Sequence, residues 1–196
     1  MHIPHAVVIG LSLLISSCGI FDTRDPEPPS QTSSNYVPPT EPSIVFSNMT
    51  TAFRDLNSLN YLRSFADSTA NGRSFAFEPT SQARSKYGGV FFNWSRESEQ
   101  RYFENLKSKV PSGSSATLTF DVLTIQSLQS DSAQYDATYR LNVQHSVSAV
   151  AKEARGRAQF FLMADRSRNW VILRWVDVTD NAATFTWSDL KGEFGQ

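Results

Sequence analysis

The sequence is poor in the residues that bind metal ions and act as catalytic nucleophiles. Its 196 residues include one cysteine, Cys18, and three histidines. A single cysteine excludes a disulfide framework within the chain. His2 and His5 lie in a segment that we expect to be removed, which leaves His145 as the remaining histidine. Because the chain has no cluster of His and Cys residues of the kind that holds zinc, we predict no metal and no cofactor.

The sequence also lacks an excess of either charge. Lysine and arginine together number 18, and aspartate and glutamate 19, so the net charge is −1. A dedicated nucleic-acid-binding protein carries a clear basic excess, so we expect no nucleic-acid partner. No phosphate-binding glycine loop is present either, because Gly88 and Gly89 stand alone and are typical of a turn.

Long hydrophobic runs are missing as well, but a short one occupies residues 6–15. It is about half of the roughly 20 residues that a membrane span needs, and it fits the centre of a signal peptide. The run ends in Ile15-Ser16-Ser17-Cys18, which resembles a bacterial lipobox. That resemblance implies a signal peptide over residues 1–17 and a diacylglyceryl group on Cys18. The alternative is a buried N-terminal helix with a core cysteine, for which the residues that follow provide no apolar partner.

A lipidated Cys18 implies a location and a tether. Several acyl chains hold a protein at a membrane far more firmly than one chain. Gly19, rather than Asp, follows the cysteine, which in enteric bacteria favours the outer membrane, so we expect a lipid-anchored protein of the bacterial cell envelope. Residues 18–42 contain many serines and a set of prolines that is typical of a disordered tether: Pro26, Pro28, Pro29, Pro38, Pro39 and Pro42.

Residues 43–196 predict a single α+β domain. Apolar residues at spacings of three and four predict an early helix that Thr40 caps, a short second helix and a third helix. Alternating apolar residues predict strands, of which the longest has apolar residues at odd positions and polar residues at even ones. The predicted helices cover residues 40–56, 59–67 and 96–109, the strands 74–78, 117–122, 133–147, 154–164, 170–178 and 183–187, and irregular segments 68–73 and 80–89.

This order of elements resembles that of the nuclear transport factor 2-like superfamily. The resemblance covers about residues 43–187 and includes Asn60-Tyr61-Leu62-Arg63-Ser64-Phe65-Ala66-Asp67 and the strand over 170–177. Residues 186–192 look like the ending of bacterial envelope lipoproteins. The resemblance implies N-terminal helices packed on a curved antiparallel sheet, a cone with a pocket between the layers. A small antiparallel barrel with added helices is the alternative.

Enzymes of this superfamily, such as isomerase-like and dehydratase-like members, use a carboxylate or an Asp/His pair inside the cone. The candidates here are Asp67, Asp121, His145, Arg174 and Asp177. A lone histidine on the apolar side of a strand is more often packed than catalytic. Strand alternation also places Asp177 on the opposite face from Arg174, which we expect beside Trp170 and Ile172. No spacing pairs these residues, and we expect that none of them is catalytic.

Basic residues concentrate on the last hairpin of the predicted sheet. Arg155 and Arg157 share a strand face with Phe161 and Met163, and Arg174 lies on the next strand. A face of this kind suits an acidic ligand, a glycan, a lipid headgroup or a protein partner. It is our candidate binding face, although an ordinary solvated sheet face explains the same pattern.

These observations predict a membrane-tethered, non-enzymatic binding or scaffold domain. One alternative is a lipid-anchored isomerase or dehydratase that acts on a small molecule. The other is an assembly subunit that forms a homodimer through its sheet. A carboxylate beside His145 at a cavity would favour the enzyme, and a broad apolar face around Phe161 and Met163 would favour the assembly subunit.

Overall fold

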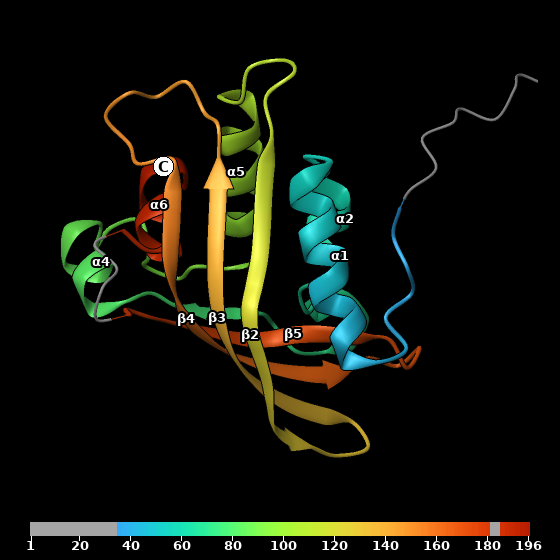
Figure 1. Cartoon of the computed structure of the whole chain (residues 1–196). Helices are drawn as coiled ribbons and strands as arrows, with labels where there is room; N and C mark the ends of the chain where they lie inside the picture. The colour runs from blue at the N-terminus through green and yellow to red at the C-terminus, as the bar shows by residue number, and fades with distance from the viewer. Residues whose placement is uncertain (1–34, 181–184) are drawn as a thin grey trace, which may run out of the picture. The chain divides into compact units, whose positions relative to one another are not determined.

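Amphipathic segments of the sequence form six helices and five strands in the described part of the chain (Figure 1). This computed structural model describes residues 35–180 and 185–196, which belong to one compact unit. Cys18, the predicted signal peptide and residues 18–34 of the predicted tether lie outside the described residues. In chain order the elements are α1 (Pro42–Arg54), α2 (Ser58–Leu62), α3 (Ser68–Asn71), β1 (Ala76–Glu78), α4 (Ser81–Lys86), α5 (Arg96–Ser108), β2 (Ala116–Leu128), β3 (Ser132–Val143), β4 (Glu153–Ala164), β5 (Trp170–Val178) and α6 (Trp187–Phe194).

Local signals explain where the two longest helices begin. Proline occupies the first turn of α1, where its missing N–H has no intrahelical acceptor. The residue before α1 is Glu41, without a side-chain capping bond, so the predicted cap at Thr40 is wrong by one residue. Helix α5 begins as predicted, with a capping box between Ser95 and Ser98. None of the described helices has the length and apolar character needed to cross a bilayer.

The strands form one curved sheet in the order β1-β5-β4-β3-β2 (Figure 1). Strands β2, β3, β4 and β5 pair antiparallel, as predicted, whereas β1 pairs parallel with β5 and makes the sheet mixed. Helix α1 packs against β2 and β5, and α6 packs against β4. The predicted α+β class, with helices packed on a curved sheet, is therefore confirmed.

Strand alternation assigns one face of the sheet to the core. In β3 the odd positions from Ala133 to Val143 are buried, and in β4 the even positions from Ala154 to Leu162 are buried, as predicted. Strand β5 departs from this rule because a β-bulge leaves Leu173 without a partner. Ile172 and Trp175 therefore both enter the core, and Arg174 is exposed, so the predicted shared face of Arg174 and Ile172 is wrong.

Several predicted bounds need correction. The second helix ends at Leu62 rather than at 67, β2 extends to Leu128 rather than 122, and β3 ends at Val143 rather than 147, so His145 follows the strand. The segments predicted as irregular contain the one-turn helix α3 and the helix α4, which Thr80 caps. A last strand was predicted over 183–187, but Trp187 begins α6, and residues 181–184 lie outside the described part. Helix α6 forms because Thr186 and Asp189 build a capping box.

Residues 35–42, predicted as tether, are bound to the domain. The Val37 N–H donates to Asn48 Oδ1 at 3.0 Å, and Asn48 Nδ2 donates to Val37 O at 2.7 Å. The Trp170 N–H donates to Pro39 O at 2.8 Å, which connects the same segment to the sheet. The folded unit therefore begins before residue 43.

Aromatic side chains fill the space between the helices and the sheet. Tyr61 stacks on Phe103 with ring centroids 4.4 Å apart, and Trp175 meets Trp187 edge to face at 4.5 Å. Such pairs add about 0.5–1.5 kcal/mol each beyond the burial of their surface. Helix α6 contributes Trp187, so the chain's own side chains fill the centre of the space between the layers, whereas an open hollow of about 570 Å³ remains between α1 and β2.

Candidate functional site

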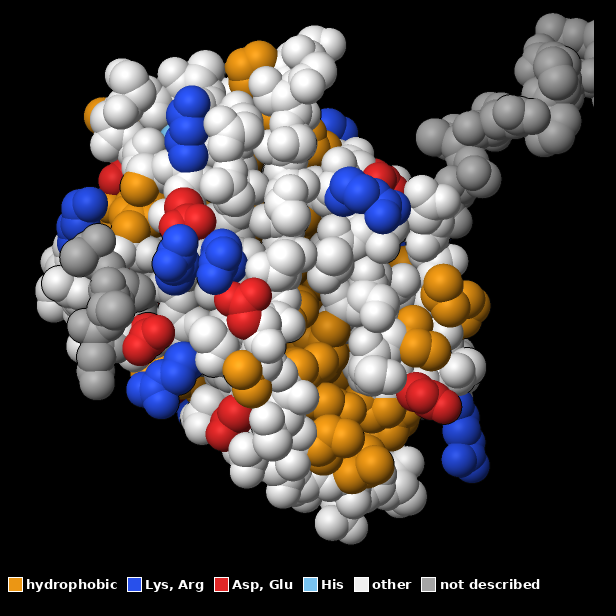
Figure 2. Space-filling view, in the orientation of Figure 1, with side chains coloured by type: hydrophobic (Ala, Val, Ile, Leu, Met, Phe, Trp, Pro, Cys, Tyr) orange, Lys and Arg blue, Asp and Glu red, His pale blue; other side chains and the backbone are white. Residues whose placement is uncertain are grey.

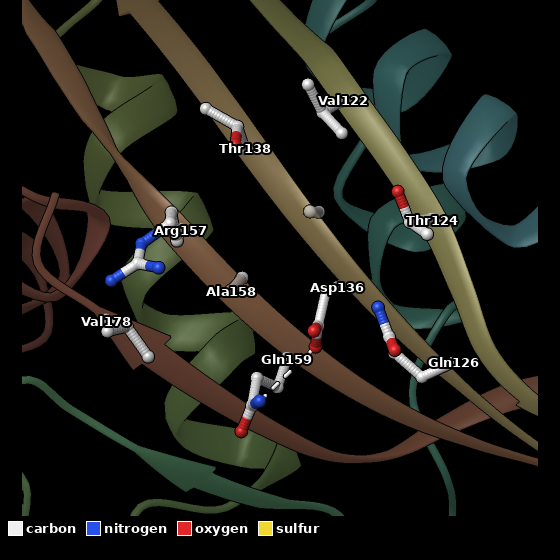
Figure 3. A pocket seen from close by; sticks show the side chains of 10 residues that line it. Val122, Thr124, Gln126, Asp136, Thr138, Arg157, Ala158, Gln159 and Val178 are labelled. Carbon is white, nitrogen blue, oxygen red and sulfur yellow. Dashed lines mark hydrogen bonds between the residues drawn. The ribbon is translucent and has the colours of Figure 1, made fainter.

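The outer face of the sheet, opposite the helices, carries a pocket of about 340 Å³ (Figure 3). Two β-bulges lie in β2 beside it, and bulges increase the local twist of a strand. Side chains from four strands line the pocket: Val122, Thr124, Gln126, Asp136, Thr138, Arg157, Gln159 and Val178. Its wall thus combines one cation, one carboxylate, two hydroxyls and two amides with aliphatic groups.

Arg157 is the distinctive residue of this pocket. The other arginines on β3, β4 and β5 each have an acidic partner: Arg140 has Asp121 at 3.4 Å, Arg155 has Glu153 at 2.6 Å, and Arg174 has Glu78 at 2.6 Å. Arg157 is exposed, and no hydrogen bond or ion pair engages it within the described residues. The pocket therefore presents a guanidinium group that is free to bind an anion.

The other residues of the predicted binding face lie on the same side of the sheet but not in one site. Phe161 and Met163 line a second hollow of about 440 Å³ near the β2–β3 turn. The Arg174 guanidinium covers the ring of Phe161, with its carbon 5.0 Å from the ring centroid. Figure 2 shows basic and acidic side chains interspersed over the strands on this face. Charged side chains of both signs share this surface with apolar ones, which include the exposed Val122, Ile125 and Leu128 of β2.

Asp67 and Asp121, two of the catalytic candidates, have structural partners. Asp67 caps α3, where its Oδ1 accepts from the Thr69 N–H at 2.9 Å and from the Thr69 hydroxyl at 2.7 Å. The bond from the Thr69 hydroxyl is the main cause that lowers the pKa of Asp67. Asp121 lies at the surface beside Arg140. The structure brings neither carboxylate to His145.

His145 is 1% exposed and packs inside the domain. Its Nε2 lies 3.2 Å from the Ala151 carbonyl oxygen, and its ring lies 5.3 Å from that of Phe194. Its Nδ1 has no hydrogen-bond partner among the described residues. The carboxylate–histidine pair that would favour an enzyme does not occur at His145 in this part of the chain.

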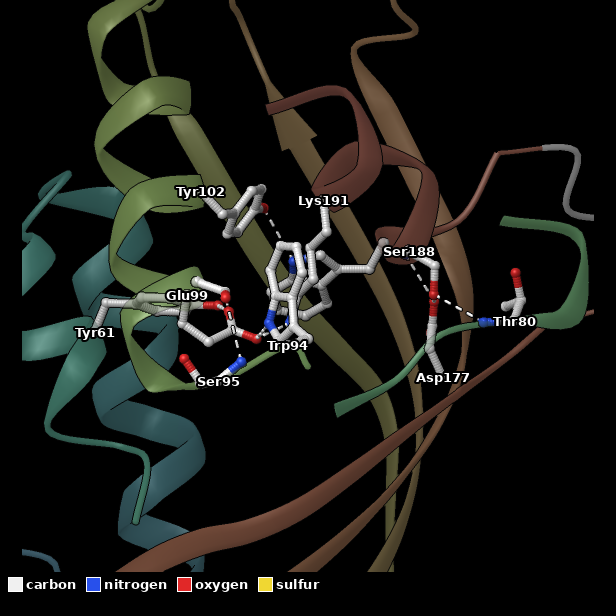
Figure 4. A network of polar contacts seen from close by, with 11 residues as sticks. Tyr61, Thr80, Trp94, Ser95, Glu99, Tyr102, Asp177, Ser188 and Lys191 are labelled. Carbon is white, nitrogen blue, oxygen red and sulfur yellow. Dashed lines mark hydrogen bonds and ion pairs between the residues drawn. The ribbon is translucent and has the colours of Figure 1, made fainter. Parts of the chain in front are cut away.

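Asp177 lies inside the cone and holds the N-terminus of α6 (Figure 4). It is 3% exposed, accepts from the Tyr139 hydroxyl at 2.7 Å and accepts from the N–H and hydroxyl of Ser188 at 2.8 and 2.5 Å. Burial raises its pKa, and these donors oppose that rise. A carboxylate at the first turn of a helix is favourable, so Asp177 has a clear structural role.

A buried ion pair between Glu99 and Lys191, which no sequence pattern predicted, lies in the interior of the domain. Both side chains are 0% exposed, and Lys191 Nζ contacts Glu99 Oε1 (Figure 4). Glu99 also accepts from the Tyr61 hydroxyl and from Trp94 Nε1, each at 2.7 Å. Burial lowers the pKa of Lys191 to about 8. In the sequence Glu99 is an acidic residue in the first turn of α5, and no local pattern relates it to a lysine far along the chain.

Metal binding has no support in the described residues, where no group of three or more His, Cys, Asp or Glu side chains is placed to hold an ion. The polar groups that the structure does bring together are therefore the outer pocket around Arg157 and the interior network around Glu99 and Asp177.

Comparison with known proteins identifies the fold. No protein-family model and no curated protein matches the sequence. Solved structures do match. One, at 12% identity and a TM-score of 0.53, is a protein from Novosphingobium aromaticivorans proposed to be an aromatic ring hydroxylase; the match covers 76% of this chain and 92% of that one.

Two further structures carry the family description itself. A nuclear transport factor 2-like superfamily protein from Salmonella enterica matches at 9% identity and a TM-score of 0.51, over 71% of this chain and 89% of that one. A proposed dehydratase of the same family from Streptomyces avermitilis matches at 9% identity and a TM-score of 0.51, over 71% and 94%. The domain therefore has the nuclear transport factor 2-like fold that the order of its elements predicted.

Proposed function

We propose that this protein is a lipid-anchored, non-enzymatic binding protein of the bacterial cell envelope, held in the outer membrane through Cys18. Its nuclear transport factor 2-like domain binds an acidic ligand at the outer pocket around Arg157. The observation that carries this proposal is the guanidinium of Arg157, which has no hydrogen-bond or ion-pair partner among residues 35–180 and 185–196. The supporting observations are the contents of the cone and the chemistry of the pocket.

The contents of the cone favour binding over catalysis. The resemblance places the catalytic groups of related enzymes inside the cone, and here that space holds Trp175, Trp187 and the Glu99–Lys191 pair. Each buried acidic group already accepts several hydrogen bonds from the protein. General acid–base catalysis needs a group that reaches its substrate within hydrogen-bond distance. Here Glu99 and Asp177 instead accept hydrogen bonds from the protein itself.

The outer pocket suits an anion with a small organic body because its carboxylate, Asp136, already accepts from Gln159 Nε2 at 3.3 Å, whereas Arg157 has no partner among the described residues. Arginine presents several N–H donors in a plane and binds carboxylate or phosphate through two of them. Thr138 and Gln126 add polar contacts, while Val122 and Val178 supply apolar walls. A volume of about 340 Å³ lies at the lower end of the range of about 300–1,000 Å³ that is usual for small-molecule sites. The ligand is therefore a compact acid or the acidic side chain of a partner.

Titration of Arg157→Ala and Arg155→Ala variants tests the pocket. Arg155 is the matched control because it lies on the same strand and is already paired with Glu153. With succinate and inorganic phosphate as probes, we expect NMR shifts at amides of β2, β3 and β4 in the wild type and the control, and at least a tenfold weaker response in Arg157→Ala. Equal responses in both variants, or none in the wild type, would contradict the proposal.

Mass spectrometry of the protein purified from membranes tests the anchor. We expect a mature chain that begins at an acylated Cys18. A Cys18→Ser variant should leave the membrane fraction while its domain still folds. An intact Met1 or an unmodified Cys18 would refute the anchor without affecting the proposal for the pocket.

A further inference from the structure

The interior of the cone contains an ammonium group surrounded by aromatic rings. Lys191 Nζ lies 3.7 Å from the ring centroids of both Phe77 and Trp175. It lies 5.5 Å from that of Trp94 and 5.8 Å from that of Tyr102. All of these rings are buried. A cation within about 6 Å of an aromatic face is attracted by it, and the attraction is largest when water is excluded.

The groups around this cation come from parts of the chain other than α6. Phe77 belongs to β1, Trp94 precedes α5, Tyr102 lies on α5, and Trp175 lies on β5. Glu99 of α5 adds the carboxylate. Helix α6 contributes the lysine that they enclose, and its Trp187 supports the cage from outside by donating from Nε1 to the Tyr102 hydroxyl at 3.0 Å. The cage and the ammonium group that it surrounds thus come from separate segments of the chain. In this respect they resemble a binding site and its free ligand.

The carboxylate of this cage has anchors that do not involve the lysine. The Tyr61 hydroxyl donates to Glu99 Oε2 and Trp94 Nε1 donates to Glu99 Oε1, each at 2.7 Å. These bonds orient both oxygens of Glu99 without any contribution from Lys191. A lysine ammonium group has three N–H donors, and Glu99 is its one hydrogen-bond acceptor among the described residues. The remaining N–H bonds therefore face the rings.

We propose that Glu99, Phe77, Trp94, Tyr102 and Trp175 form a binding site for a primary alkylammonium ion, which Lys191 occupies as an intramolecular ligand. The site is separate from the outer pocket and does not depend on the function proposed for it. Selectivity follows from the chemistry: the carboxylate requires a positive charge, and the close spacing of the rings requires a slim cation. In the wild-type chain the site is filled, so free amines do not enter.

A shortened lysine tests the site directly. Lys191→Ala removes the three outer methylenes and the ammonium group, which are the atoms of propylammonium. Near pH 7, where a group with a pKa of about 8 is protonated, we expect the variant to melt below the wild type. Propylammonium chloride at about ten times its Kd should raise the melting temperature of the variant by about 3 °C. The wild type should not respond beyond the effect of equal sodium chloride.

Neutral and negative analogues separate a charge-selective site from a simple cavity. 1-Propanol and propionate have nearly the same size, and we expect neither to stabilise Lys191→Ala as propylammonium does. Equal stabilisation by propanol would mean that only the void is filled, and it would overturn the proposal. Adding Glu99→Gln to Lys191→Ala should remove the preference for the amine, because the carboxylate is lost.

A surface lysine provides the matched control. Lys86 Nζ also lies over an aromatic ring, 4.5 Å from the centroid of Tyr87, and pairs with Glu193, but its side chain is 58% exposed. Lys86→Ala should gain nothing from propylammonium. If Lys191→Ala does not fold alone, refolding from denaturant with propylammonium must recover the cooperative transition. Failure to recover it would also overturn the proposal.

Discussion

Lys191 affects how the stability of the domain depends on pH. Burial lowers its pKa to about 8, from an ordinary value of 10.5. An unfolded chain keeps the proton up to the higher value, so between these two pH values the unfolded state binds more protons. The free energy of unfolding therefore rises with pH across this window. The same contribution is lost as the pH falls through about 8.

A Lys191→Met variant makes this contribution measurable. Urea unfolding between pH 7 and about 9.5 should show the wild type gaining stability relative to the variant, by at most about 1.4 kcal/mol per pH unit above pH 8. Burial raises the pKa values of Tyr61, Tyr102 and Tyr139 well above the ordinary value of 10.0, so their ionisation does not interfere in this range. Parallel stability curves for the two proteins would refute the assignment.

For single residues, the sequence predicted the face of a strand but not the partner of a side chain. Alternation placed Arg155 and Arg157 on one strand face, and both are exposed there. Which of them lacks a partner depends on Glu153 and on the neighbouring strands, and a face assignment carries no such information. Glu99 and Lys191 are separated by 92 positions. Their pairing follows from the packing of α6, which itself was not predicted.

At the scale of elements, α6 packs so closely that one of its residues must be glycine. A Cβ atom on Gly192 would lie under 3.0 Å from ring atoms of Tyr87. Tyr87 cannot easily move, because its hydroxyl donates to Glu193 at 2.5 Å. The contact between α6 and the segment after α4 therefore depends on the absence of a side chain.

Gly192→Ala should reduce the free energy of unfolding by about 1–3 kcal/mol, as overpacking of a well-filled site does. Thermal unfolding followed by circular dichroism measures the loss. Gly89→Ala is the control, since a Cβ atom there meets nothing within 4 Å. We expect the control to melt like the wild type, and equal destabilisation by both substitutions would disprove this account of the contact.

Long and strongly periodic elements were predictable, whereas short ones were not. Strand β3 and helix α5 carry their own signals, a sustained alternation in one and a capping serine in the other. Helices α3 and α4 span four and six residues, too few for a period of 3.6 to be recognised. The bulge at Leu173 inverted the expected face of Arg174 because a bulge depends on the register of the neighbouring strand.

For the domain as a whole, the segment at the start of the folded unit adds to the free energy of unfolding. The segment before α1 contributes three backbone contacts, two with the buried side chain of Asn48 and one with Trp170. A chain that begins at residue 43 leaves Asn48 without both partners. Unpaired buried polar groups are costly, at about 1–3 kcal/mol each.

We therefore expect a protein spanning residues 35–196 to be more stable to urea than one spanning 43–196, by about 2–4 kcal/mol. Both should unfold cooperatively, because the aromatic core lies within the shorter chain. An Asn48→Ala substitution in the longer chain should remove part of its extra stability, because the two bonds with Val37 are then lost. If the two chains have the same midpoint, the segment does not belong to the folded unit.

The position of α6 in the chain has a consequence for biosynthesis. Trp187 and Lys191 occupy the centre of the core, but they leave the ribosome after every residue that encloses them. The nascent chain can form its helices and hairpins early, yet its centre stays open until this last segment emerges. The location that we propose for this protein requires it to cross a membrane. A polypeptide that crosses in extended form must stay unfolded during transit. Because Trp187 and Lys191 follow the residues that enclose them, closure of the core waits until α6 has emerged.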